Sequence, residues 1–448
     1  MANFRTEHDT LGDVQVPADA LYGAQTQRAL DNFPISGYHL PPPFIHALGL
    51  VKSCAAHVNQ LPAIEKAAAS ITLGEHDDQF LVDVFQTGSG TSTNMNANEV
   101  IARLASQATG KPVHPNDDVN RGQSSNDVIP TALHVSAALE IHKNLLPAIA
   151  ELQESLSQKA AEFSGIVKIG RTHLQDAVPM TLGQEFSGYA RQAELAAERI
   201  RVTLDGLFEL PLGGTAVGTG LNAPHGFAAA VIARIATVTG LPFEEAKNHY
   251  EAQASRDAAC FTSGAIRTWA AALSKIANDI RWLGSGPRCG LGELRLPSTQ
   301  PGSSIMPGKV NPVIAESVLM VAAQVIGFDA TITWSAAAGN FELNVMMPVI
   351  AYSLLESIRL LASASRNFSA KCIRGLEADR ERIGGFVEQS LAMVTALVPV
   401  IGYENAAEIA KEAFRTRETV RQVARRRSGL ADNQLEDLLN PQRQAGVD

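Results

Sequence analysis

The chain has 448 residues and a net charge of −9 at pH 7, with 45% hydrophobic and 19% charged residues. Such a chain is long enough for roughly three domains and a large core, and its composition is that of an ordinary globular protein. The negative charge argues against general nucleic-acid binding. The four cysteines are scattered and form no CxxC pair, so we expect reduced thiols in a cytosol.

The first ten residues, MANFRTEHDT, contain no apolar segment of the kind that a signal peptide needs. We also expect no stretch long and apolar enough to span a membrane. The sequence therefore predicts a cytoplasmic protein that is neither secreted nor membrane-spanning. Residues 1–111 contain short segments separated by prolines, which predict several short helices joined by turns.

Two polar, flexible stretches occur in the first third of the chain. Residues 88–94, GSGTSTN, come before apolar residues at helical spacing. Residues 114–127, HPNDDVNRGQSSND, place a histidine, amides, carboxylates and hydroxyls together ahead of another helical segment. N-capping would explain one serine of this second stretch but not the whole cluster. Both stretches are predicted to be loops that lead into helices.

The middle of the chain is predicted to form long helices, with little strand-like alternation. Apolar residues recur at spacings of three and four in residues 131–163, 181–205, 253–283 and 310–360. These apolar positions cover more than one face, so the helices need partners on several sides and indicate a bundle that continues across subunits. Residues 168–186 form a further predicted polar loop, and shorter helical segments follow from about residue 394.

The most informative stretch is Gly302–Pro312, GSSIMPGKVNP. Its glycines and prolines predict a loop whose backbone can approach a ligand closely. Apolar residues recur at helical spacing from Val310 onward, so a helix is expected to begin near Asn311. The start of a helix carries unpaired N–H groups and partial positive charge, and Lys309 adds a full charge. The density of polar groups favours an anion site over a simple tight turn.

Two phosphate-binding patterns do not fit. A Walker loop has four residues between its glycines and a hydroxyl after its lysine, whereas Gly302 and Gly308 enclose five residues and Val310 follows Lys309. Residues 218–223 match GxGxxA, but no good strand precedes them and no ribose-binding acid follows at the expected spacing.

Metal and hydrolase sites are also poorly supported. There is no HExxH pattern, and Asp117 and Asp118 have only His114 nearby, so we expect no metal and no cofactor. A hydrolase triad would use Ser303 and His173 with an acid, but no GxSxG pattern surrounds either serine of this loop. Polar loops on an apolar helical scaffold instead suit a small, negatively charged molecule held by neutral donors and a lysine.

An ordered set of motifs over essentially the whole chain resembles class II fumarases of the fumarase/aspartase superfamily. The motifs are GSSIMPGKVNP, VPADALYGAQTQRAL, GSGTSTNMNANEV, HPNDDVN, QSSND, GRTHLQDA, GGTAVGTGLN, GPRCG, GNFELNV and IGYENAAEIAKEA. The resemblance implies a mainly α, three-domain fold with domains at residues 1–123, 124–393 and 394–448. It also implies a homotetramer whose central long helices form one bundle, with no nucleic-acid or membrane partner. Each active site would then be assembled from three subunits.

The same resemblance implies roles for individual residues. His173 resembles the proton donor and acceptor, Ser303 the second catalytic residue, and Glu316 the acid that orients the histidine. Residues in four places would bind the dicarboxylate substrate: Ser89, Gly90 and Thr91; Ser124, Ser125 and Asn126; Thr172; and Ser304, Lys309, Val310 and Asn311. A second dicarboxylate site would comprise His114, Pro115, Asn116 and Asp117, with Lys111 standing where some members have arginine.

The implied activity is the reversible hydration of fumarate to (S)-malate, a hydro-lyase reaction of the tricarboxylic acid cycle. The developing charge on the substrate needs donors, which Lys309, Asn311 and the helix start would supply. A serine hydroxyl is a weak base unless its alkoxide is stabilised, so Ser303 needs Lys309 or loop N–H groups nearby. His173 with Glu316 would activate water or protonate the departing hydroxide.

Two alternatives stay open at this point. Aspartate ammonia-lyases share the fold, the loop and the fumarate product, but Ser125 stands where they tend to have threonine and His173 where many have glutamine. A catalytically inactive binding protein could use the same scaffold. The joint presence of Ser303, His173 and Lys309 argues against that second alternative.

Overall fold

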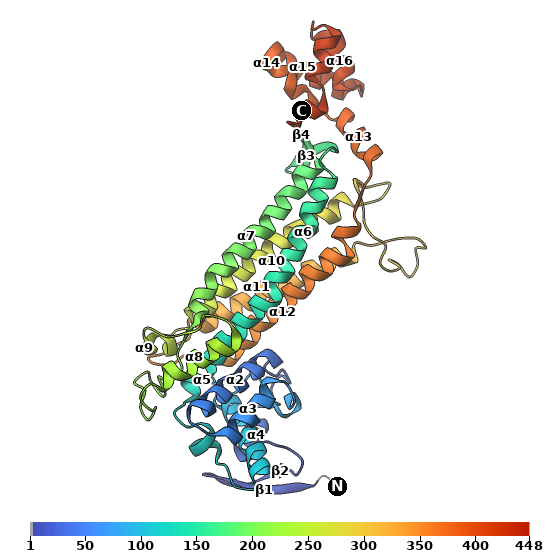
Figure 1. The fold of residues 1–448 in the computed structure, drawn as a ribbon. Helices are drawn as coiled ribbons and strands as arrows, with labels where there is room; N and C mark the ends of the chain where they lie inside the picture. Colours follow the sequence, from blue (N-terminus) through green and yellow to red (C-terminus); the bar gives the residue numbers. More distant parts are fainter. Residues whose placement is uncertain (1–2, 448) are drawn as a thin grey trace. The chain divides into compact units, whose positions relative to one another are not determined.

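The computed structural model describes residues 3–447, which are mainly helical as the sequence predicts (Figure 1). The chain divides into two compact units. Unit 1 comprises residues up to Pro147, Ala196–Ala270 and Ala322–Ala362, and unit 2 comprises Ala148–Leu195, Ala271–Val321 and the residues from Ser363 onward. The division into three domains at residues 123 and 393 stays a prediction.

The N-terminal part of unit 1 differs from the prediction in one respect, because it begins with a β-hairpin. Strands β1 (Phe4–Asp9) and β2 (Gly12–Pro17) pair antiparallel, with one face of β2 half-buried. Four helices follow as predicted: α1 (Ala24–Asn32), α2 (Pro42–Val58), α3 (Pro62–Thr72) and α4 (Thr91–Thr109). Prolines stand at the start of α2 and α3, where their missing N–H costs nothing.

The predicted long helices are present. Their bounds are α5 (Ser125–Glu140) and α6 (Leu146–Glu162), joined by a π-helical turn, then α7 (Leu182–Phe208), α10 (Asp257–Leu283), α11 (Val313–Ala336) and α12 (Met347–Lys371). The prediction of one long helix over residues 310–360 was wrong, since residues 337–346 separate α11 from α12. The side-chain amide of Asn344 donates to the Ser335 carbonyl (2.9 Å), and its oxygen accepts from the Met346 N–H (2.9 Å). This side chain satisfies backbone groups at both helix ends.

Smaller elements complete unit 1. They are α8 (Phe227–Thr239), α9 (His249–Ala254) and the two-residue parallel strands β5 (Glu209–Leu210) and β6 (Glu244–Glu245). In α2 nearly all apolar side chains are buried, which makes this helix a centre of the unit 1 core.

In unit 2 the prediction of a polar loop at residues 168–186 was wrong, because residues 168–181 lie in a β-hairpin and helix α7 begins at Leu182. Strands β3 (Val167–Thr172) and β4 (Gln175–Thr181) pair antiparallel with a register shift between Ile169 and Arg171. The β-bulge interrupts the alternation of side chains, so the strand signal in the sequence is weak.

The C-terminal part of unit 2 consists of shorter helices, as predicted. They are α13 (Arg380–Gln389), α14 (Val398–Ile401), α15 (Tyr403–Thr416), α16 (Val420–Arg427), α17 (Asp432–Leu438) and α18 (Pro441–Gln444). The short strands β7 (Leu294–Arg295) and β8 (Glu377–Ala378) pair antiparallel. A core that includes Leu397, Ile409 and Val423 also takes in Ile169 of β3, so the hairpin packs on these helices.

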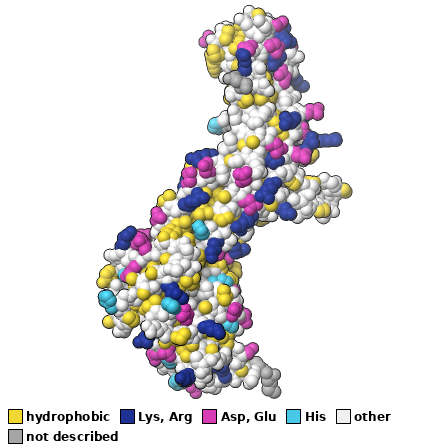
Figure 2. Space-filling view, viewed as in Figure 1, with side chains coloured by type: hydrophobic (Ala, Val, Ile, Leu, Met, Phe, Trp, Pro, Cys, Tyr) yellow, Lys and Arg dark blue, Asp and Glu magenta, His cyan; other side chains and the backbone are white. Residues whose placement is uncertain are grey.

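We expected no apolar stretch of membrane-spanning length, and this expectation was wrong when helices are judged by length and composition alone. Helix α11 and the segment Met347–Gly375 are both long and apolar enough to cross a bilayer. In α11 the side chains buried within the chain include Asp329, which accepts hydrogen bonds from Ser263 (2.7 Å) and Arg267 (2.9 Å) of α10. Its other faces leave apolar side chains exposed, among them Met320 and Trp334. Figure 2 shows exposed apolar side chains among charged ones on one face of the molecule.

Candidate active site

In unit 1 the structure brings together two of the predicted substrate-binding loops. Helix α4 begins at Thr91 and α5 at Ser125, and their hydroxyl oxygens are hydrogen-bonded at 2.8 Å. The hydroxyl of the buried Ser89 lies 2.7 Å from that of Thr91. Gly90 precedes α4 with φ of 73°, a conformation that suits glycine. Two helix N-termini with their partial positive charges therefore meet at a row of hydroxyls, which suits a carboxylate.

The start of α5 is fixed by the buried carboxylate of Asp127. It accepts hydrogen bonds from the backbone N–H groups of Ser124 (2.9 Å), Gly213 (3.0 Å) and Thr215 (2.9 Å). Burial raises the pKa of Asp127 to about 6, although these N–H groups act in the opposite direction. The Asn126 amide donates to the Ala216 carbonyl (2.8 Å). The turn that carries the predicted binding residues is thus tied to the 213–216 segment.

A buried lysine lies close to this turn. Lys52 of α2 is fully buried and donates to the side-chain oxygen of Asn120 (3.0 Å), which also accepts from the amides of Asn94 and Asn98 (each 3.2 Å). Burial lowers the pKa of Lys52 to about 7, and the charge of Asp127 acts in the opposite direction. The sequence analysis missed Lys52, and the one signal for it is a single charge inside an otherwise apolar helix.

In unit 2 the loop around Ser303 is closed at its neck by one backbone and one side-chain hydrogen bond. The Gly302 N–H donates to the Lys309 carbonyl (2.9 Å), and the Asn311 amide donates to the Gly302 carbonyl (2.5 Å). A Cβ at position 302 would lie 2.3 Å from the Lys309 oxygen, so only glycine fits there. Helix α11 then begins at Val313, close to the predicted start.

The hydroxyl oxygen of Ser303 accepts hydrogen bonds from the N–H groups of Ile305 (3.2 Å) and Met306 (3.0 Å). Both donors would stabilise negative charge on this oxygen, which the predicted role of the serine as a base requires. Ser304, Lys309 and Val310 are exposed, and residues 298–303 and 306–310 line a hollow of about 480 Å³. The loop can therefore admit a small anion beside an ammonium group.

His173 lies at the tip of the β3–β4 hairpin. Thr172 pairs with Gln175, so His173 and Leu174 are the two residues of the turn, and both are exposed. Among residues 3–447 of one chain, no hydrogen bond joins His173 to Ser303 or to Glu316, which lies in the first turn of α11. The pairing of His173 with Glu316 stays a prediction.

The predicted second dicarboxylate site falls on a short, exposed helical turn of unit 1, Pro115–Val119. His114 caps this turn, and its Nδ1 accepts from the Asp117 N–H (3.1 Å). Pro115, Asn116 and Asp117 are neighbours on the same turn, and whether they bind a ligand stays a prediction.

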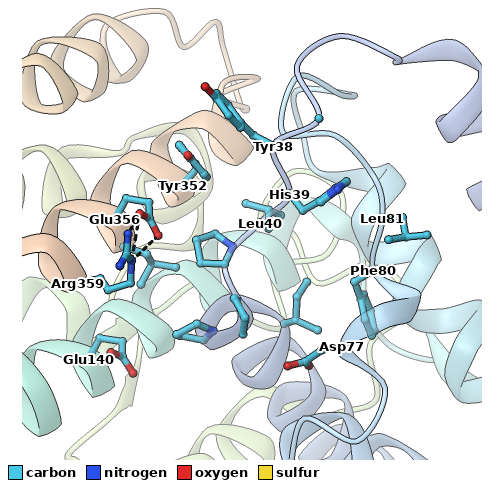
Figure 3. Close-up of a pocket in the computed structure, with 16 residues that line it drawn as sticks. Tyr38, His39, Leu40, Asp77, Phe80, Leu81, Glu140, Tyr352, Glu356 and Arg359 are labelled. Carbon is cyan, nitrogen blue, oxygen red and sulfur yellow. Dashed lines mark hydrogen bonds and ion pairs between the residues drawn. The ribbon is translucent and has the colours of Figure 1, made fainter. Parts of the chain in front are cut away.

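A further cavity of about 520 Å³ in unit 1 contains none of the predicted residues (Figure 3). The rings of Tyr38 and Tyr352 stack at its edge with centroids 5.6 Å apart. Its one arginine, Arg359, is hydrogen-bonded to Glu356 (2.6 Å), and Asp77 and Glu140 add further carboxylates. With its arginine already paired, this cavity is a poor site for a dicarboxylate.

Comparison with known proteins gives a consistent result. The family described as "Lyase" matches residues 12–327, and the family described as "Fumarase C C-terminus" matches residues 393–444. The class II fumarate hydratase of Neisseria meningitidis is 52% identical, with 98% of each chain covered. That of Mycobacterium tuberculosis is 55% identical, covering 98% of this chain and 94% of the relative.

Solved structures agree with these relatives. A class II fumarase from Schistosoma mansoni superimposes with a TM-score of 0.96 at 40% identity, with 99% of each chain covered. A fumarate lyase:delta crystallin from Brucella melitensis superimposes with a TM-score of 0.94 at 45% identity, covering 99% of this chain and 100% of the other. The chain therefore belongs to the class II fumarate hydratase family of lyases.

Proposed function

We propose that the chain catalyses the reversible hydration of fumarate to (S)-malate by acid–base catalysis. The observation that carries this proposal is the environment of Ser303. The hydroxyl oxygen of Ser303 accepts hydrogen bonds from two backbone N–H groups, and Lys309 lies in the same loop. The alkoxide form of Ser303 would therefore be stabilised. Such an alkoxide could remove the weakly acidic proton beside a carboxylate, which this reaction requires.

The substrate would be held through its two carboxylates. The hydroxyls at the starts of α4 and α5 would bind one carboxylate, and Lys309 with Asn311 would bind the other. As the C–H proton passes to Ser303, negative charge grows on the adjacent carboxylate, and these donors would stabilise it.

His173 would carry out the proton transfer to and from the water molecule that is added or removed. Its imidazole would accept a proton from water during hydration, so that the hydroxyl adds to one olefinic carbon while the other carbon receives the proton from Ser303. In dehydration His173 would return a proton to the departing hydroxide. Glu316 would orient the imidazole and stabilise its charged form.

We further propose that the site is completed by other copies of the chain, in a homotetramer. Support comes from α11, where Met320 is 68% and Trp334 78% exposed although both are large and apolar. Burial of this surface against the same helix of other copies would explain its composition without a membrane. The chain would then act in the cytoplasm on a small dicarboxylate, with no nucleic-acid partner.

The test is the absorbance of fumarate in the presence of purified protein. We expect fumarate to be consumed in buffer alone and malate to appear in equal amount. Consumption only after ammonium is added would contradict hydration and identify an ammonia-lyase. No consumption under either condition would exclude both activities.

A further inference from the structure

The hairpin turn that carries His173 is strained. His173 and Leu174 have φ of 56° and 59°, so both lie in the left-handed region. A two-residue turn with this geometry favours Asn-Gly, because other side chains meet the backbone there. Two bulky residues keep this conformation only where the surrounding structure imposes it.

Two charged side chains of the strand that leads into this turn pair with a buried carboxylate. Arg171, two residues before His173, donates to the carboxylate of Glu293, which is fully buried. Lys168 of the same strand is 1% exposed and lies 3.3 Å from the other oxygen of Glu293. The ammonium of Lys168 also donates to Glu185 of α7 (2.7 Å).

The backbone around Glu293 is anchored by residues outside the hairpin. Its carbonyl accepts from the Asp379 N–H (2.9 Å), and the next residues pair with β8. The guanidinium of Arg382 on α13 donates to the carbonyls of Gly290 (2.8 Å) and Leu291 (3.0 Å). Figure 1 shows α13 near the hairpin in unit 2. Glu293 is therefore a fixed point against which the hairpin can be oriented.

The guanidinium of Arg171 depends on Glu293 for its orientation. Among the described residues its Nη1 is buried without a hydrogen-bond partner, and the Phe386 ring lies 5.9 Å from its central carbon. A buried ion pair contributes little net stability compared with apolar side chains of similar volume. The Arg171–Glu293 pair lies at the base of a strained turn, which suggests that its role is to fix the conformation of that turn.

We propose that Glu293 is a positioning residue for the reaction: through Arg171 it holds the turn in the conformation that aims the His173 imidazole at the substrate. This inference rests on the proposed function of His173. It assigns to Glu293 no contact with substrate. Loss of the carboxylate would let the turn relax, and a small displacement of a catalytic group costs a large factor in rate.

The test is Glu293→Gln, which keeps the shape of the side chain and removes its charge. We expect kcat for fumarate hydration to fall by about ten- to a hundredfold with a smaller change in KM, and the pH profile of kcat to shift. In a His173→Asn background the same change should cause no further loss, because its effect passes through the imidazole. The control is Arg295→Gln, which breaks an exposed pair with Asp379 in the same segment and should leave kcat unchanged.

Arg171→Lys provides a second variant that does not depend on the folding of Glu293→Gln. This variant keeps the positive charge but replaces the planar guanidinium by an ammonium group. We expect kcat to fall by about as much as in Glu293→Gln. Wild-type kcat and pH profile in both variants would overturn the inference, as would equal losses with and without His173. A wild-type protein that does not hydrate fumarate would instead overturn the proposed function.

Discussion

The hydroxyl oxygens of Thr91 and Ser125 lie 2.8 Å apart although 34 positions separate them in the sequence. Each is the first residue of a helix, so the contact joins the N-termini of α4 and α5. The two helix starts can then act on one carboxylate group of a ligand, and neither loop would suffice alone.

Removal of the Thr91 hydroxyl should weaken substrate binding. In Thr91→Val the side-chain volume is kept while one donor to the carboxylate is lost, and hydrogen bonds to charged groups contribute about 1.5–3 kcal/mol. We expect KM for fumarate to rise about tenfold or more, with a smaller effect on kcat, in steady-state measurements. Ser92→Ala is the matched control, since that hydroxyl is bonded to Thr87 instead (3.0 Å). An unchanged KM in Thr91→Val would remove this residue from the site.

Ser303→Ala should abolish most of the activity. The variant keeps the loop backbone but loses the oxygen that accepts two N–H groups, so we expect kcat to fall by about a hundredfold or more. Ser317→Ala is the control, because the Ser317 hydroxyl donates to the Ile314 carbonyl within helix α11 (2.8 Å). Near-wild-type turnover in Ser303→Ala would contradict a role of this serine as the base.

The buried Lys52 should make stability depend on pH. Its pKa in the folded chain, lowered to about 7 by burial, lies below the ordinary value of 10.5. Between these values the unfolded chain binds more protons, so this residue's contribution to stability rises with pH and is lost as pH falls from 10.5 to about 7. Wild-type protein should therefore gain stability relative to Lys52→Met from pH 7 to 10, by on the order of 1 kcal/mol per pH unit.

The measurement is the melting temperature of both proteins across this range at one fixed protein concentration. The exposed lysine of α3 is exchanged in the same way as a control, Lys66→Met. A difference between wild type and Lys52→Met that stays constant with pH would mean that Lys52 titrates as an ordinary lysine.

Sequence reasoning succeeded where local chemistry decides the structure. The capping box of Ser124 and Asp127 and the neck of the Gly302 loop are set by residues close together in the chain, so their polar character was visible. The hairpin at His173 was not predicted, because its turn lacks Asn or Gly and its bulge breaks the alternation.

Contacts between distant segments could not be predicted from the residues alone. Nothing near Lys52 in sequence indicates that Asn120 accepts its hydrogen bond, and nothing near Arg171 indicates Glu293 as its partner. Such partners are chosen by tertiary packing, so a lone charge in an apolar segment is the most that the sequence offers.

Because no hydrogen bond joins His173 to Ser303 among the described residues of one chain, we predict that each active site takes His173 from one chain and Ser303 from another. Co-expression of His173→Asn and Ser303→Ala chains, each of which should keep only a small residual activity alone, tests it directly. In random mixed tetramers, the chain that supplies His173 to a site has an unmutated histidine in about half of the cases, and the chain that supplies Ser303 has an unmutated serine in about half. About a quarter of the sites are then intact, so we predict about a quarter of wild-type activity. Mixed tetramers, verified by separable tags, that stay as inactive as either parent would show that both residues come from one chain.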